Sequence, residues 1–485
     1  MATLVTTSQE PKIPFDMAYG QNIVTLEGIT PSQSKYALRI YVLGNTEPIA
    51  DIRQTPNRYN RAIFDIQTIL QTQVQPTINN IDGLHYSAGF AQQNTRMQIA
   101  NGELVQYQIA YTTETNGEPD DPFFQDPTIY TTLGGSKEYW QVPYEEGDDY
   151  IPTLAGTAGS GCTQIITPAR PLSDNVWTIS DTETGDNLLT DNGGYSSPGG
   201  IDVQNVYLND QCTKSFWQTV NRQGTPAVPA SNVRGIEGFW VLQYAKNGTL
   251  LSTNWLSNVQ ANGGGPNITL GQGQIPSGNF NVITVATGPA NFPIGQLLST
   301  TDHYYIIPAA WGCVVDPQGQ IDAMQDAAWR IQRYNVINEP CNDYDHIQFA
   351  WLNSEGFRDQ FTFTKKNEKK INTKRNNYLK DVGDFNQITY DVNKQSRGFT
   401  TYSQQIREVW SAMSGYMNDK EAELLESMFK SPSVMVRFSA GEYANTWIPI
   451  NVISSSYTQK TYRKDRLFQY TVDYKLASNI KSQRG

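Results

Sequence analysis

The chain has 485 residues, which is long enough for two to four domains that each bury a core. Its net charge is −11, only 17% of its residues are charged, and it holds 27 Tyr, 18 Phe and 10 Trp. This composition argues against a helical cytosolic enzyme and favours twisted sheets with polar loops. We find neither a signal-peptide pattern in residues 1–15 nor a run of roughly 20 apolar residues that would span a membrane.

Residues 1–125 have the pattern of an N-terminal β-sandwich-like domain. Hydrophobic alternation predicts a strand over residues 36–42, and turn residues on either side of 48–53 predict a returning strand. A third strand over 62–66 leads into a short helix over 66–72, with Asp65 as its cap and Ile66, Ile69 and Leu70 on one face. Further strands are predicted over 96–99 and 104–111.

Residues 126–300 are predicted to form an inserted, loop-rich β-domain. Glycines cluster at 193–200 and 263–265, and short aromatic strands are expected over 175–179 and 238–244. Long loops of this kind lie at protein surfaces and make contacts.

Residues 301–485 are predicted to form a C-terminal β-rich domain. Strands are expected over 303–308 and 326–334, followed by a hairpin over 348–363 whose turn contains Gly356. A basic arm over 365–380 follows, and a capping box from Asn418 to Glu421 predicts a helix over 420–430. The closing strands are 433–438, 447–453 and 468–476. The predicted fold class is therefore mainly β, with several β-sandwich-type domains, a few short helices and long Gly/Asn/Thr-rich loops.

Charge is distributed unevenly along the chain. Residues 346–485 carry 21 Lys and Arg against 14 Asp and Glu, a net of +7, and residues 1–345 carry 15 against 33, a net of −18. Opposite charges on two parts of one chain suit head-to-tail contacts between copies. Two domains that merely differ in charge are an equally good explanation.

Patterns that carry chemistry are weak in this sequence. The densest set of potential metal ligands is Cys341, Asp343, Asp345 and His346, whose spacing matches no ligand pattern and indicates a polar turn instead. The acidic residues near Gly185 indicate a solvated turn rather than a calcium loop. No nucleophile elbow and no phosphate-binding loop occurs. We therefore predict no catalytic residue, no metal site and no cofactor, so that the protein is not an enzyme.

The four cysteines are far apart in sequence, and none forms a Cys-x-x-Cys pair. This spacing argues against a zinc ribbon or a redox dithiol and favours buried thiols over two disulfides. The residues concerned are Cys162, Cys212, Cys313 and Cys341.

The basic arm is the strongest charge feature. Lysines at this density suit contacts with nucleic-acid phosphates or with an acidic protein surface. We favour protein contact over direct nucleic-acid binding, because the whole chain is acidic and holds no nucleic-acid-binding motif. The interface candidates are the arm lysines and the aromatic residues of the preceding hairpin: Lys365, Lys366, Lys369, Lys370, Trp351, Phe361 and Phe363.

Both ends of the sequence resemble virion proteins of tailed bacteriophages that infect Bacteroidetes-type hosts, the crAss-like phages among them. The resemblance covers about half of the chain, and the middle matches nothing in that group. The segments that carry it are 35–42, 49–57 and 63–66 near the N-terminus, and 349–353, Gly356, 361–363 and 470–476 near the C-terminus.

The resemblance implies a structural component of the tail, baseplate or neck, which forms a ring with other copies of itself and contacts other tail or neck proteins. Such a protein is made in the host cytoplasm and resides in the virion tail. The resemblance provides no catalytic residues. Three other roles stay open: a receptor- or glycan-binding tail protein, a glycan-degrading enzyme, and a bacterial surface adhesin, against which the missing signal peptide argues.

Overall fold

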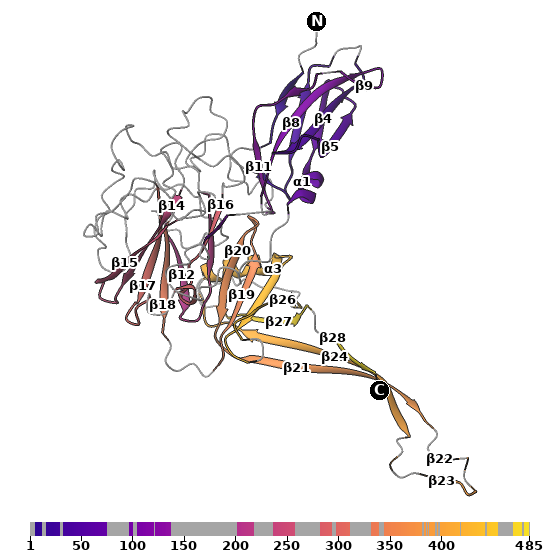
Figure 1. Ribbon diagram of the computed structural model, residues 1–485, viewed down its shortest axis with the longest axis vertical. Coiled ribbons are helices and arrows are strands. Elements are labelled where there is room, and N and C mark those ends of the chain that lie inside the picture. Colours follow the sequence, from indigo (N-terminus) through magenta and orange to yellow (C-terminus); the bar gives the residue numbers. More distant parts are fainter. Residues whose placement is uncertain are drawn as a thin grey trace. The chain divides into compact units, whose positions relative to one another are not determined.

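A computed structural model describes part of the chain, shown in Figure 1. It groups the chain into two compact units. The first unit comprises Met1–Pro340, Ala350–Gln360 and Glu423–Ser431, and the second comprises Cys341–Phe349, Phe361–Ala422 and Pro432–Gly485. The described residues are 5–11, 16–29, 33–74, 97–99, 104–120, 122–136, 201–217, 236–257, 282–292, 297–310, 331–338, 344–380, 383–384, 386, 388–392, 395, 398–417, 419–441, 444–453, 469–477 and 480–484. None of the helices among them is long and apolar enough to span a membrane.

Two sheets form the N-terminal part of the first unit. The smaller has the order β1 (Thr6–Gln9), β3 (Ile23–Glu27), β6 (Arg61–Asp65). The larger has the order β2 (Asp16–Met17), β11 (Tyr130–Leu133), β8 (Leu104–Thr115), β4 (Lys35–Val42), β5 (Ala50–Gln54), with β9 (Glu118–Pro119) and β10 (Phe124–Gln125) against β8. Side chains of both sheets, such as Leu26, Leu38 and Phe64, pack into one core. The alternating burial of β6 is what a half-buried strand requires.

The short helix α1 (Gln67–Gln73) closes this core. Ile66 and Leu70 are fully buried, which confirms the apolar face predicted for this segment. The predicted cap needs a correction, because Ile66 rather than Asp65 occupies the N-cap position. Asp65 is the last residue of β6, and its Oδ1 still accepts a hydrogen bond of 3.0 Å from the backbone N–H of Gln67.

A second pair of sheets forms the middle of the first unit. One has the order β12 (Ile201–Tyr207), β18 (Ile331–Ile337), β17 (His303–Ala310), β14 (Ile236–Tyr244), β15 (Leu250–Ser257), in which β12 and β18 are parallel. The other has the order β13 (Thr213–Trp217), β16 (Val282–Ala286), β7 (Met97–Ile99). Phe216 and Val285 of the small sheet pack against Phe239, Tyr304 and other buried residues of the large one. The turn η6 (Pro289–Asn291) follows β16.

The second unit is built on one sheet. Its order is β20 (Arg358–Phe363), β19 (Ile347–Leu352), β25 (Val434–Phe438), β26 (Trp447–Val452), β27 (Thr471–Leu476), β24 (Phe399–Met413), β21 (Asn367–Leu379), with β28 (Ile480–Arg484) against β24. Residues 347–349 and 361–363 of β19 and β20 belong to this unit. Two short strands, β22 (Gly383–Asp384) and β23 (Asp391–Val392), pair with each other in the segment of the chain that connects β21 to β24. The helix α3 (Asp419–Lys430) precedes β25.

The fold class predicted from the sequence is confirmed: the described residues are mainly strand in several sheets, and their only α-helices are α1 and α3. The predicted hairpin over 348–363 and the helix over 420–430 are present as β19–β20 and α3. The three-part division at 125 and 300 stays a prediction. The strand expected over 175–179, the cap residue Asn418, and three of the four cysteines lie outside the described residues, whereas Cys212 is a buried thiol.

Candidate assembly interface

The turn that joins β19 to β20 is fixed by one asparagine. Oδ1 of Asn353 accepts hydrogen bonds from the backbone N–H groups of Glu355 (3.1 Å) and Phe357 (2.9 Å). Gly356 has a φ of +87°, a conformation that glycine adopts without a steric penalty. The predicted turn around Gly356 therefore has a local cause in these residues.

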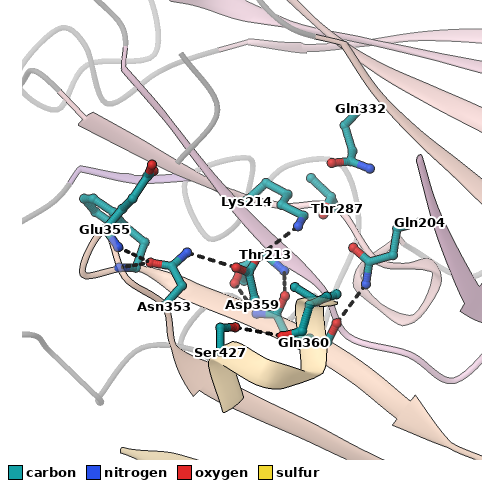
Figure 2. A network of polar contacts seen from close by, with 12 residues as sticks. Gln204, Thr213, Lys214, Thr287, Gln332, Asn353, Glu355, Asp359, Gln360 and Ser427 are labelled. Carbon is teal, nitrogen blue, oxygen red and sulfur yellow. Dashed lines mark hydrogen bonds and ion pairs between the residues drawn. The ribbon is translucent and has the colours of Figure 1, made fainter. Parts of the chain in front are cut away.

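A buried ion pair begins next to this turn. Nζ of Lys214, on β13, lies 3.1 Å from Oδ1 of Asp359, and the two side chains are 1% and 0% exposed. Nδ2 of Asn353 donates to the other carboxylate oxygen of Asp359 at 3.1 Å. Figure 2 shows these side chains converging from β13 and from the hairpin. The residue that shapes the turn therefore also orients the carboxylate.

Gln360 extends the network to two further positions on the middle sheets. Its side-chain amide makes two hydrogen bonds with Thr213. Oε1 accepts from the backbone N–H at 3.3 Å, and Nε2 donates to Oγ1 at 2.6 Å. Nε2 of Gln204, on β12, donates to the backbone carbonyl of Gln360 at 3.0 Å. Residues 353–360 are thus held to both middle sheets by polar contacts that are buried throughout.

The same turn meets the N-terminal sheets at close range. The backbone N–H of Ser136 donates to the carbonyl of Ser354 at 2.7 Å. A Cβ on Gly135 would lie 2.2 Å from that carbonyl oxygen, and a Cβ on Gly356 would lie 2.5 Å from the carbonyl carbon of Gly134. The two backbones approach at a distance that only glycines permit. These buried contacts hold the hairpin against the N-terminal and middle sheets.

Gly356→Ala is expected to lower the free energy of unfolding by about 2 kcal/mol or more, since it combines a positive φ with a backbone clash. The measurement is the urea-induced unfolding midpoint. Gly248→Ala is the matched control, because Gly248 also has a positive φ (+78°) but has open space around its Cβ position. If the two variants lose equal stability, the close approach contributes nothing.

The second feature is a long ribbon, by which we mean β21, β24 and the segment 380–398 that joins them. The two strands pair antiparallel from Asn367–Ala412 to Leu379–Phe399, with a register shift after Asn376 (Figure 1). All residues of β21 after Asn367 are exposed. β28 pairs with β24 only over residues 403–407, so the described part of the ribbon beyond Ser403 is two-stranded.

The basic arm, residues 365–380, contains strand β21 of the ribbon. Nζ of Lys369 lies 3.1 Å from a carboxylate oxygen of Glu408 and 4.9 Å from the centre of the Trp410 ring. Lys366 forms an ion pair with Glu368, which raises the pKa of Lys366. Lys370 is exposed, and Lys365 is half-buried. Three of the four predicted lysines therefore present charge to solvent.

The aromatic interface candidates lie elsewhere. Trp351 and Phe363 are 0% exposed, and Phe361 is half-buried. Nε1 of Trp351 donates to Oγ of Ser427 at 2.6 Å within the first unit, and the Phe363 ring lies 4.8 Å from that of Phe349 within the second. These contacts are core packing, and a role at an interface between chains stays a prediction for the three residues.

Sequence reasoning missed two sets of residues that the structure brings out. The two residues of the ion pair, Lys214 and Asp359, are 145 residues apart along the chain, and no local pattern links them. The end of the ribbon, residues 378–402, which we call the ribbon tip, was not singled out, although residues 388–392 alternate apolar with polar side chains. Its exposed apolar side chains are Tyr378, Leu379, Ile388, Tyr390, Val392, Phe399 and Tyr402.

The described residues hold no group of three or more His, Cys, Asp or Glu side chains arranged to bind a metal ion. Of the cluster noted in the sequence, Cys341 and Asp343 lie outside them.

Comparisons with known proteins add little. No model of a protein family matches the sequence, and no curated protein matches it. Among solved structures, a marsupial T cell receptor aligns with 85% of this chain and 96% of its own length, at 9% identity and a TM-score of 0.14. A likeness at that score carries no argument about fold or function.

Proposed function

We propose that this protein is a non-enzymatic structural component of a tailed-phage virion, which forms a ring with copies of itself in the tail, baseplate or neck. The observation that carries the proposal is the long ribbon, whose β21 strand is exposed along almost its whole length. A two-stranded ribbon has little stability of its own in water. A ribbon of this length therefore gains from packing on a partner.

The charge of the ribbon supports the kind of contact proposed. Lys369 and Lys370 lie on its exposed strand and Lys366 directly precedes that strand, all in the part of the chain with a net charge of +7. The rest of the chain carries −18. Head-to-tail contacts between identical chains close into rings when the rotation between neighbours permits, and complementary charge favours that contact over others.

The test is charge reversal on the ribbon. The fourfold variant combines Lys365→Glu, Lys366→Glu, Lys369→Glu and Lys370→Glu. It is expected to reduce the yield of complete particles, counted by electron microscopy after complementation of a phage that lacks the gene. Repulsion from the acidic part of a neighbour is the physical reason. The particle yield of the single variant Lys370→Glu is compared with that of Lys246→Glu. Lys246 is an exposed lysine in the turn between β14 and β15. Normal particle yield with the fourfold variant would contradict the proposal.

A further inference from the structure

We infer that the ribbon tip is a docking element that is buried against a second copy of this chain. The inference rests on the proposed function, since it names the partner and the part of the ribbon that makes the contact. Leu379 and Phe399 face each other across the two strands and are 72% and 73% exposed. Ile388, in the connecting segment, is fully exposed. Exposed apolar side chains gathered at one place mark interaction sites.

The composition of the ribbon changes along its length. The part near the sheet carries Lys369, Lys370 and Lys374, and the tip carries aromatic and aliphatic residues. The rings of Tyr378 and Tyr402 lie 6.2 Å apart on the two strands. Exposed apolar side chains bordered by charged residues, within the tip and beside it, are the arrangement of an interface core with a polar rim.

The backbone of the tip is a second reason to expect a partner. The ladder between β21 and β24 shifts register between Asn376 and Asn377, and β28 stops at Ser403 on the neighbouring strand. A bulge turns the strands that follow it in a new direction. Beyond this point the described residues contain no third strand that would stabilise the pair, and two strands alone are marginal in water. Contact with another protein would supply the missing stabilisation.

Charge complementarity favours a second copy of this chain as the partner of the ribbon tip. The ribbon belongs to the part of the chain with a net charge of +7, and residues 1–345 of any other copy offer −18. A lipid bilayer would also accept an apolar tip flanked by lysines. Asp381, Asp384 and Asp391 belong to the tip by sequence, however, and β22 and β23 place two of them opposite each other. Carboxylates are costly to insert into hydrocarbon and are repelled by anionic lipids and nucleic acids.

The experiment mixes full-length chains labelled with ¹⁴N and ¹⁵N and applies a crosslinker that joins lysines to carboxylates. Mixed-isotope crosslinks from Lys369, Lys370 or Lys380 to acidic residues within 1–345 are expected, together with slower hydrogen exchange of residues 376–379 and 399–402 as concentration rises. The variant with Leu379→Asn and Phe399→Asn is expected to weaken self-association by at least about tenfold, because two apolar side chains lose their burial. Both positions are exposed, so the fold should be retained.

The matched control is Leu208→Asn with Tyr59→Asn, which removes two apolar side chains that are 51% and 67% exposed in the first unit. Self-association that is equally weakened by both pairs would overturn the inference. So would crosslinks confined to one isotope, or a tip that binds vesicles of anionic lipid and not a second chain. If the tip variant fails to enter particles while the purified wild type never self-associates, the tip docks on a different virion protein. The inference and the self-assembled ring then both fail, whereas a structural role in the virion still stands.

Discussion

Asp359→Ala is expected to lower the free energy of unfolding by about 3–5 kcal/mol, the largest loss we predict for any polar residue of the chain. The substitution leaves the Lys214 ammonium buried without the carboxylate that lies 3.1 Å from it. It also removes the acceptor of the Asn353 amide, which in turn shapes the hairpin turn. Urea unfolding followed by tryptophan fluorescence provides the measurement.

The double variant Lys214→Met with Asp359→Leu separates the two sources of this loss. Replacement of both charges by apolar groups of similar size removes the uncompensated charge, so we expect it to recover most of the stability lost by Asp359→Ala. The control is Asp51→Ala, which breaks the exposed ion pair between Arg39 and Asp51 and should cost less than about 1 kcal/mol. An Asp359→Ala variant as stable as Asp51→Ala would show that the buried pair does not hold the hairpin.

Trp351→Ala is expected to cost about 3–5 kcal/mol of unfolding free energy, because a fully buried indole leaves a cavity that the surrounding core cannot fill. Ser427→Ala removes the acceptor of the indole N–H together with the hydrogen bond that Oγ donates to the Leu424 carbonyl, and should cost about 1–3 kcal/mol. The thermal unfolding midpoints of the two variants give this ranking.

The matched control for Trp351 is Tyr416→Ala, since Tyr416 is a large aromatic residue with 71% of its surface exposed. We expect that variant to unfold within about 0.5 kcal/mol of the wild type. If Trp351→Ala is as stable as Tyr416→Ala but abolishes self-association, the tryptophan contributes to an interface between chains and not to the core.

The local elements of this fold could be predicted because their causes are local. Alternating apolar residues in 36–42 and 62–66 are sufficient to indicate strands, and β4 and β6 are there. Gly356 and Asn353 sit where the hairpin turn requires them. Prediction from alternation fails for the ribbon. The 15 residues of β24 are only partly buried, and its sequence lacks the clean alternation of a half-buried strand.

The candidate interface was predicted in part. The density of lysines identified the basic arm, because like charges in one segment are visible in the sequence alone. Whether an aromatic residue is buried depends on partners that are distant in sequence, and Trp351 meets Ser427 across 76 residues. The same holds for Lys214 and Asp359, whose pairing depends on how β13 and the hairpin come together. Long-range contacts have no periodic signature in the sequence.

The mass of the purified full-length chain in solution, measured by light scattering and combined with negative-stain imaging, tests the proposed assembly most directly. Closed rings of several copies, which the fourfold Lys-to-Glu variant of the basic arm fails to form, are the predicted result. A chain that stays monomeric at its highest soluble concentration, with no rings in the images, would contradict self-assembly through the ribbon.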